Sequence, residues 1–290
     1  MAPRLTIAIP LHRGEKWIEG IIDTVAKAPE SSRVILSDAS RQDDAIERLA
    51  EIFRADDRVE VISRPETLGW VQHANLLLEE AETEFFCWMP QDDLVAPAGY
   101  FEMLVASLDQ NPDRILAFPT VLRKATKGRL RKRPVGEVPF RPPPLELGHA
   151  GPAEEAVRML RDWNLGLGCW RGVFRTREAR PIPMTDDCAD LVWTFSLALA
   201  GNFVWVEPAR YVKRFHHGSA HRLMRWQGMS GTVDLYRAEV EARLGSDPAL
   251  AENVMDEVCR YLHRHRLTMV TAPLRPLAAL ALDRPRPVFE

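Results

Sequence analysis

Short apolar runs alternate with longer stretches of helical periodicity through the first 110 residues of the chain. Four runs rich in apolar residues predict strands, at residues 5–10, 34–36, 59–62 and 85–89. Apolar residues recur at helical spacing after each run, at residues 15–27, 46–53, 71–82 and 100–108. Four such repeats predict βαβ units, and therefore an α/β fold with a mainly parallel, Rossmann-like sheet and helices on both faces.

The pattern changes after a further predicted strand at residues 115–122. Residues 123–133 hold seven basic side chains and no acidic one, and residues 134–144 are rich in proline. A solvated, mobile loop or linker over residues 123–150 explains both features. Closure of this basic loop over a diphosphate, or attraction of an acidic acceptor or a membrane surface, is the functional alternative.

Regular patterning returns in the second half of the chain. Apolar spacing predicts helices at residues 153–163 and 190–200, short strands at 203–206 and 211–215, and two amphipathic helices after residue 222. We therefore divide the chain into an α/β half at residues 1–122, a second half at 123–221, and C-terminal helices with a tail at 222–290.

Composition and charge narrow the function classes. With 46% apolar residues and a net charge of −3, the 290-residue chain gives no charge argument for a nucleic-acid partner. The four cysteines form no CxxC pair, which argues against a disulfide framework or a zinc site and fits a reducing compartment. The N-terminus runs straight into a strand, and no apolar run approaches the ~20 residues that span a bilayer. We expect a cytoplasmic protein.

Two adjacent acids, Asp92 and Asp93, follow the fourth predicted strand. Ligands bind at the carboxyl ends of strands in open α/β sheets. Oxygen ligands at that position suit Mg²⁺ or Mn²⁺, which share phosphate oxygens with one or two carboxylates. The alternative is a solvated acidic turn before the next helix.

Other polar groups also follow predicted strands. Asp38 ends the second strand, where it could cap the next helix or accept a hydrogen bond from a nucleoside. His216 and His217 follow the last predicted strand beside Lys213 and Arg214, a grouping that favours an anion or metal site over a structural role.

A third acidic group, Asp186, Asp187 and Asp190, precedes the apolar helix at residues 190–200. These acids either complement the helix dipole or include a general base. The chain lacks GxGxxG and GxxxxGK[ST] motifs, so dinucleotide and P-loop sites lose support.

Taken together, these segments resemble the family-2 glycosyltransferases of the GT-A fold. The resemblance covers about 220 residues in the family's order, at the opening strand (residues 6–18), the strand ending in Ser37-Asp38-Ala39-Ser40, the segment 68–75, the strand with the acidic metal motif (88–97), the helix 190–201 and the segment 211–219. No single motif is decisive, and their joint order carries the resemblance.

The resemblance implies an inverting hexosyltransferase-like enzyme that moves a sugar from a nucleoside-diphosphate sugar to an acceptor hydroxyl, assisted by Mn²⁺ or Mg²⁺. It implies a general base at Asp190 and metal ligands at Asp92 and His216. The implied nucleotide-sugar contacts are Pro10, His12, Glu15, Asp38, Asn75, Gln91 and Asp92. The implied donor is a UDP-, GDP- or dTDP-sugar, and the acceptor is a saccharide, a lipid-linked or small molecule, or a peptide. Peripheral membrane contact stays open.

Two departures from the family pattern bear on this expectation. Pro90 stands where the first acid of the metal motif is usual, and Ala189 stands where a Glu usually precedes the base. Asp187 is the reserve choice for the base. A non-catalytic sugar-nucleotide-binding or interaction protein on the same fold is the alternative, and a nucleotidyltransferase is a weaker one.

Overall fold

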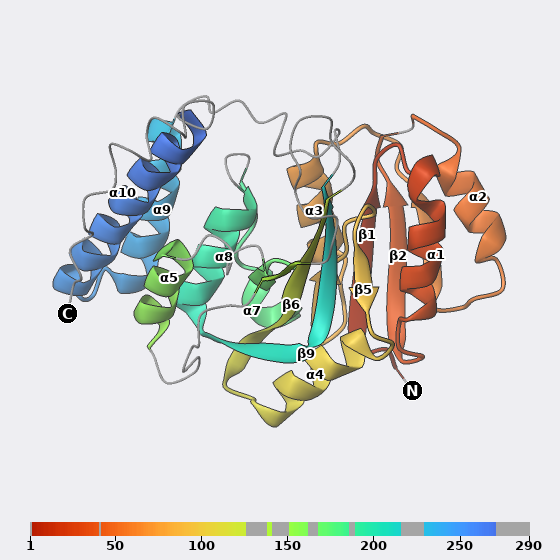
Figure 1. Ribbon diagram of the computed structural model, residues 1–290, viewed down its shortest axis with the longest axis horizontal. Helices are drawn as coiled ribbons and strands as arrows, with labels where there is room; N and C mark the ends of the chain where they lie inside the picture. Colours follow the sequence, from red (N-terminus) through yellow and green to blue (C-terminus); the bar gives the residue numbers. More distant parts are fainter. Residues whose placement is uncertain are drawn as a thin grey trace. The chain divides into compact units, whose positions relative to one another are not determined.

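The computed structural model describes residues 2–40, 42–125, 138–140, 151–161, 168–185, 189–215 and 229–270. Its contacts divide the chain into two units, Met1–Gln227 and Gly228–Glu290. The first unit is a mixed α/β unit with a nine-stranded sheet in the order β3-β2-β1-β4-β8-β6-β9-β5, where β7 pairs with β6 (Figure 1). This architecture confirms the predicted fold class.

The first half of the sheet is parallel, as the sequence predicts. Its strands are β1 (Leu5–Leu11), β2 (Ser32–Asp38), β3 (Val59–Ser63) and β4 (Phe85–Trp88). The connecting elements are the 3₁₀ turn η1 (Glu15–Trp17) and the helices α1 (Ile18–Ala26), α2 (Ala45–Ile52) and α3 (Trp70–Glu79). Helix α4 (Tyr100–Gln110) follows β4 and the short strand β5 (Leu94–Ala96).

Both faces of these strands are covered, which explains their unbroken apolar runs. Alternate residues of β1, such as Leu5 and Ile7, join one hydrophobic cluster with Ile21 of α1, which lies in front of the strands in Figure 1. On the opposite face, the indole N–H of Trp88 donates a 3.0 Å hydrogen bond to the carbonyl oxygen of Ala74 in α3. The sheet is therefore fixed from both sides near the end of β4.

The second half of the sheet is mixed. It contains β5, β6 (Arg114–Ala125), β7 (Val138–Phe140), β8 (Val173–Arg175) and β9 (Asn202–Phe215). β8 is antiparallel to both β4 and β6, and β5 is antiparallel to β9, whereas β6 and β9 are parallel. Strands β5, β7 and β8, each of three residues, were not predicted because such short segments show no alternation, and β7 lies within the loop expected at residues 123–150.

The last strand of the sheet corrects a prediction. Two short strands were expected at residues 203–206 and 211–215, but β9 is one strand of 14 residues. Its pairing with β6 shifts register between Pro119, opposite Val206, and Thr120, opposite Arg210. The irregularity accommodates the polar and proline residues that interrupt the apolar pattern, and it keeps the strand continuous.

The remaining described helices are α5 (Pro152–Arg161), α7 (Thr176–Ala179) and α8 (Ala189–Ala200) in the first unit, and α9 (Met229–Leu244) and α10 (Pro248–Val270) in the second. Helices α5 and α8 pack on one another, as do α9 and α10, whose Tyr236 and Tyr261 rings meet edge to face at 6.4 Å. The two predicted C-terminal helices are confirmed. Within the described residues, no helix is long and apolar enough to cross a membrane.

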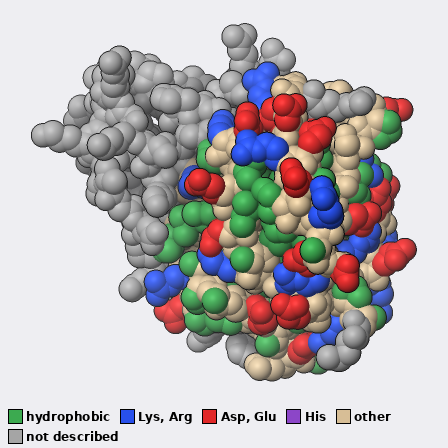
Figure 2. All heavy atoms as spheres, turned by 90° about the vertical axis from the view of Figure 1, so that its right-hand side faces the viewer, with side chains coloured by type: hydrophobic (Ala, Val, Ile, Leu, Met, Phe, Trp, Pro, Cys, Tyr) green, Lys and Arg blue, Asp and Glu red, His purple; other side chains and the backbone are tan. Residues whose placement is uncertain are grey.

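Most of the basic, proline-rich region, at residues 126–137 and 141–150, lies outside the described residues. Elsewhere the surface charge is mixed. On the face in Figure 2, acidic and basic side chains are interspersed among hydrophobic ones, and among the described residues neither sign dominates that face. This mixture agrees with the small net charge of the chain.

Candidate functional site

The parallel strands bring the predicted site residues to one edge of the sheet. In the β1–β2 register, Leu11 lies opposite Asp38, and in the β2–β3 register Asp38 lies opposite Ser63. The amide of Met89, just after β4, donates to the carbonyl oxygen of Ala8 at 2.8 Å. The segments that follow β1, β2, β3 and β4 therefore all begin at the carboxyl edge, where open α/β sheets bind ligands.

Asp38 is fixed at the end of β2 by its own turn. It is 2% exposed, and its Oδ1 accepts hydrogen bonds from the backbone N–H and the hydroxyl of Ser40, at 2.8 and 2.7 Å. These contacts form a local turn, and Asp38 does not cap the next helix, because α2 begins at Ala45 with Asp44 at its N-cap. They also hold the carboxylate in one orientation at the sheet edge, as a residue that recognises a ligand requires.

A buried polar network lies beside Asp38, and sequence reasoning missed it. His73 of α3 is 3% exposed, and its Nε2 lies 2.8 Å from the Ser37 hydroxyl, which accepts a 2.9 Å hydrogen bond from Nε of Arg64. Arg64 also makes a two-pronged ion pair with Glu80, at 2.7 and 2.6 Å. Burial, reinforced by the Arg64 charge, lowers the pKa of His73 to about 4. Neutral His73 is hydrogen-bonded to the Ser37 hydroxyl, so the network fixes the end of β2.

The segment after β1 is tied to the segment after β4. The side-chain amide of Gln91 accepts from the His12 backbone N–H at 3.1 Å and donates to the His12 carbonyl oxygen at 2.6 Å. The His12 side chain is exposed, and Pro10 is half-buried in β1 opposite Ser37. Gln91, expected to contact a donor, thus joins two loops of the site.

Glu15 is exposed at the same edge and is ion-paired. Its Oε1 lies 2.9 Å from an Nη of Arg48 in α2, and its backbone N–H donates to Asp43 at 3.1 Å. Exposed pairs of this kind contribute about 0–1 kcal/mol to stability. Glu15 therefore lies at the exposed side of the sheet edge. Its contacts also connect the start of η1 to α2 and to the segment before it.

Asn75 connects α3 to the segment that precedes α8. Its amide donates to the carbonyl oxygen of Met184 and accepts from the Met184 backbone N–H, both at 2.8 Å. Asn75 was expected to contact the donor, but in the structure its amide group holds a main-chain segment 109 residues away. Asn75 therefore fixes the main chain shortly before α8.

The two adjacent acids after β4 have different surroundings. Asp93 is 1% exposed, and its carboxylate accepts hydrogen bonds from the Tyr211 hydroxyl and the Arg214 backbone N–H, each at 2.8 Å. Arg171 and Lys213 lie 3.7 and 3.9 Å from the same carboxylate. Burial raises the pKa of Asp93, and the two cations oppose that shift. Asp93 therefore belongs to the core of the fold.

Asp92 is the carboxylate of this pair that is not buried, since its residue is half-exposed at the edge of the sheet. Its carbonyl oxygen accepts a 2.5 Å hydrogen bond from Nε of Arg214. Pro90 offers no side-chain donor atom. Among the described residues, no group of three His, Cys, Asp or Glu side chains is arranged to hold a metal ion.

An aromatic contact links this loop to α8. The rings of Trp88, at the end of β4, and Trp193, in α8, meet edge to face with centroids 4.9 Å apart. Trp193 lies one helical turn after Asp190, and Trp88 lies four residues before Asp92. The ring of Trp170 also stacks on that of Trp88, with centroids 5.7 Å apart. The contact brings the helix of the predicted base to the strand of the predicted metal ligand.

Several predicted residues cannot be placed. Asp186, Asp187, His216 and His217 lie outside the described residues. Asp190 is the second residue of α8, and only its backbone is described. The described part of the site thus comprises Asp38, the loop 90–93 and the first turn of α8.

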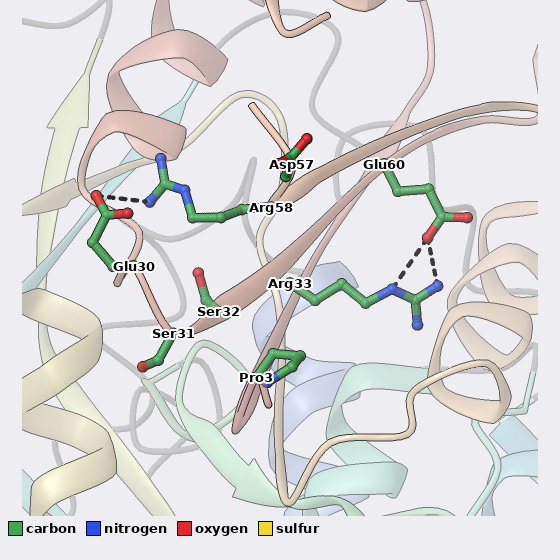
Figure 3. A pocket seen from close by; sticks show the side chains of 8 residues that line it. All are labelled: Pro3, Glu30, Ser31, Ser32, Arg33, Asp57, Arg58 and Glu60. Carbon is green, nitrogen blue, oxygen red and sulfur yellow. Dashed lines mark hydrogen bonds and ion pairs between the residues drawn. The ribbon is translucent and has the colours of Figure 1, made fainter. Parts of the chain in front are cut away.

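A separate hollow of about 340 Å³ lies near the amino ends of β1, β2 and β3 (Figure 3). Its charged groups pair with one another: Arg33 lies 2.5 Å from Glu60, and Arg58 lies 3.8 Å from Glu30. The hollow is at the edge opposite the predicted site residues, and its arginines already have carboxylate partners. It is therefore not the candidate site.

Comparison with known proteins identifies the class. The sequence model for glycosyl transferase family 2 matches residues 6–156, more than half of the chain. The chain therefore belongs to glycosyl transferase family 2.

Two curated relatives are uncharacterized glycosyltransferases of Haemophilus influenzae. One is 26% identical over 121 residues, covering 41% of this chain and 37% of the relative. The other is 26% identical over 95 residues, covering 32% of this chain and 38% of the relative. The chain thus matches less than two fifths of the length of these relatives.

Solved structures share the fold. The S. aureus TarS 1–349 structure in complex with UDP-GlcNAc superposes with a TM-score of 0.67 at 16% identity, covering 89% of this chain and 72% of that one. GalNAc-T7 with UDP, GalNAc and Mn²⁺ superposes with a TM-score of 0.56 at 14% identity, covering 83% of this chain and 48% of that one. These similarities establish the GT-A type of fold.

Proposed function

We propose that this chain transfers a sugar, with inversion, from a nucleoside-diphosphate sugar to an acceptor hydroxyl. One observation carries the proposal: Asp38 and the loop that bears Asp92 lie at the same carboxyl edge of a parallel sheet, in a chain of glycosyl transferase family 2. Family membership suggests the reaction, and the local contacts suggest the division of roles. We infer that Asp38, held by Ser40, binds the base or ribose of the donor.

The residues of the loop fit a divalent cation that binds together with the phosphates of the sugar nucleotide. Mg²⁺ and Mn²⁺ commonly use one or two protein carboxylates and complete their shell with phosphate oxygens and water. Asp92 supplies one half-exposed carboxylate, while Asp93 is committed to Tyr211 and Arg214. We infer that Asp92, together with His216, holds the cation, which when bound neutralises charge on the diphosphate leaving group.

Asp190 is the proposed general base. The acceptor oxygen attacks the anomeric carbon as the bond from that carbon to the diphosphate oxygen breaks. The acceptor proton passes to the carboxylate of Asp190, and attack from the face opposite the leaving group inverts the anomeric configuration. The contact between Trp88 and Trp193 supports this role, because it brings the first turn of α8 toward the end of β4, which leads into the loop with Asp92.

The donor class is proposed as a UDP-sugar before a GDP- or dTDP-sugar. The TarS 1–349 structure contains UDP-GlcNAc or UDP, and the GalNAc-T7 structure contains UDP. The acceptor is a saccharide, a lipid-linked or small molecule, or a peptide. We further propose that the reaction takes place in the cytoplasm, with peripheral membrane contact if the acceptor is lipid-linked.

The test is a thermal-shift screen of UDP-, GDP- and dTDP-sugars with MnCl₂, followed by an assay of nucleoside-diphosphate release from the donor that stabilises the chain. General-base assistance is typically worth about 10²–10⁴-fold, so Asp190→Asn should lower turnover by that order and leave donor binding unchanged. Asp187→Asn is the matched control and should leave turnover near the unaltered rate.

Three results would contradict the proposal. Stabilisation by a donor without any release or transfer would favour a non-catalytic sugar-nucleotide-binding protein. Loss of turnover in Asp187→Asn, with full turnover in Asp190→Asn, would move the base to Asp187. If no sugar nucleotide stabilises the chain, the proposed function is wrong.

A further inference from the structure

We propose that Arg214 is a positioning residue that fixes Asp92 at the sheet edge, and that the absence of a side chain at Gly20 of α1 leaves space for the Arg214 guanidinium. The assignment rests on the proposed function, because it concerns how Asp92 is held for its ligand. The sequence grouped Arg214 with His216 and His217 as an anion or metal site. Its contacts in the structure indicate a different role.

Arg214 binds two successive residues of the loop, one through its main chain and one through its side chain. Its Nε donates to the carbonyl oxygen of Asp92 at 2.5 Å, and its backbone N–H donates to the carboxylate of Asp93 at 2.8 Å. A charge-assisted hydrogen bond to a carbonyl oxygen is among the stronger hydrogen bonds in proteins. Arg214 thereby joins the end of β9 to the peptide unit that carries the proposed metal-binding side chain.

The rest of the guanidinium is held in an unusual way. It lies over the ring of Trp17, with Cζ 4.9 Å from the ring centroid. Its Nη2 is buried and has no hydrogen-bond partner among the described residues. A buried donor without an acceptor costs free energy. The arrangement is therefore better explained by what Nε does for Asp92 than by the stability of the side chain itself.

Gly20 explains how the guanidinium fits. A Cβ built on Gly20 would lie 2.9 Å from Nη2 of Arg214 and 3.3 Å from the side chain of Leu94. Gly20 lies inside α1, where glycine is less favourable than alanine. A methyl group at this position would therefore press on the movable end of Arg214 and on the side chain of Leu94.

The loop that bears Asp92 is thus held on both sides. Gln91 is bound to the His12 backbone, and Asp93 is bound to Tyr211 and Arg214. Arg214 also donates a hydrogen bond to the carbonyl oxygen of Asp92, which lies between them. Residues that orient a metal ligand typically change metal affinity or activity about 10–100-fold when altered. The same range is expected for Arg214, although it is not a ligand.

The experiment compares Gly20→Ala, Arg214→Ala and the double variant, with Arg210→Ala as control. Arg210 is an exposed arginine of the same strand. UDP affinity is measured by calorimetry with and without MnCl₂, and hydrogen exchange is measured over residues 89–95. We expect each single variant to lose about 10-fold or more of the Mn²⁺-dependent affinity and to exchange faster at residues 89–95.

The double variant separates positioning from general damage. Because both changes act on one contact, it should bind no more weakly than Arg214→Ala. Gly20→Ala should keep the melting temperature, since alanine favours the helix. Unchanged affinity or exchange in the single variants, or additive losses in the double variant, would overturn the assignment. If the unaltered chain binds no UDP with MnCl₂, the proposed function fails instead, and hydrogen exchange still decides whether Arg214 holds the loop.

Discussion

The buried carboxylate of Asp93 accepts a 2.8 Å hydrogen bond from the backbone N–H of Arg214, which lies 121 residues further along the chain. The same carboxylate accepts the Tyr211 hydroxyl and lies within 4 Å of cationic groups on Arg171 and Lys213. One acid of the adjacent pair therefore joins β9 to the end of β4. The other acid, Asp92, is half-exposed at the sheet edge.

The first prediction concerns the stability that Asp93 provides. Asp93→Ala leaves Arg171 and Lys213 without their buried counter-charge and should lower the free energy of unfolding by roughly 3–5 kcal/mol. Urea titration followed by circular dichroism measures the loss. Asp57→Ala is the control, because Asp57 is exposed, and it should change stability by less than about 0.5 kcal/mol. Equal stability of the two variants would show that the Asp93 contacts contribute little.

The sequence could indicate this loop but not the separate roles of its two acids. Asp92 and Asp93 are the same residue type at adjacent positions, so the sequence does not distinguish them. The partners that distinguish them lie at residues 171–214. The strands β1, β2, β3 and β4 were predictable, because an apolar run ended by polar or proline residues is a local signal. Pairing between segments far apart in the chain is not a local signal.

The same limit explains the other differences. β9 continues past Glu207 and Pro208 because β6 accommodates an irregular register there. The contact of Asn75 with Met184 joins residues 109 positions apart, which no local pattern indicates. His73 stands in the segment 68–75 that carried the family resemblance, yet only the fold shows that it meets Ser37.

The second prediction is a pH dependence from His73. Its folded pKa of about 4 is below the unfolded value of 6.5, so the unfolded state binds more protons between these values. The stability is fully present above pH 6.5 and falls as the pH drops toward 4, by up to about 3 kcal/mol. His73→Gln removes the titrating group while keeping a polar side chain.

Urea titrations at pH 7.0, 6.0, 5.0 and 4.5 measure the effect. The difference in unfolding free energy between the unaltered chain and His73→Gln should shrink as the pH falls, because only the unaltered chain loses the His73 contribution. His263→Gln, at a residue exposed on α10, serves as the control. A difference that stays constant with pH would contradict a neutral, buried His73.

The third prediction concerns the link from α3 to the acidic cluster. Asn75→Ala removes both 2.8 Å hydrogen bonds to the main chain of Met184, which leads toward α8. We expect turnover of the sugar nucleotide to fall by about 10-fold or more, since small misplacements of a catalytic group have effects up to about 10²-fold. Nucleoside-diphosphate release measures the change.

Asn111→Ala is the matched control for this prediction. Its amide also donates a 2.8 Å hydrogen bond to a main-chain carbonyl oxygen, that of Ser107, but it lies at the end of α4. The control should keep turnover close to the unaltered rate. Equal losses of turnover in both variants would indicate a general effect on stability and no specific role for Asn75.

The most direct test of the account is calorimetry of UDP binding, with and without MnCl₂, on the unaltered chain and on Asp92→Ala. The account predicts that Mn²⁺ tightens UDP binding to the unaltered chain, and that Asp92→Ala loses this increment while keeping the weaker metal-independent binding attributed to Asp38. Asp57→Ala, at the opposite edge of the sheet, should behave like the unaltered chain. A full Mn²⁺ increment in Asp92→Ala, or no UDP binding by the unaltered chain, would contradict the central claim.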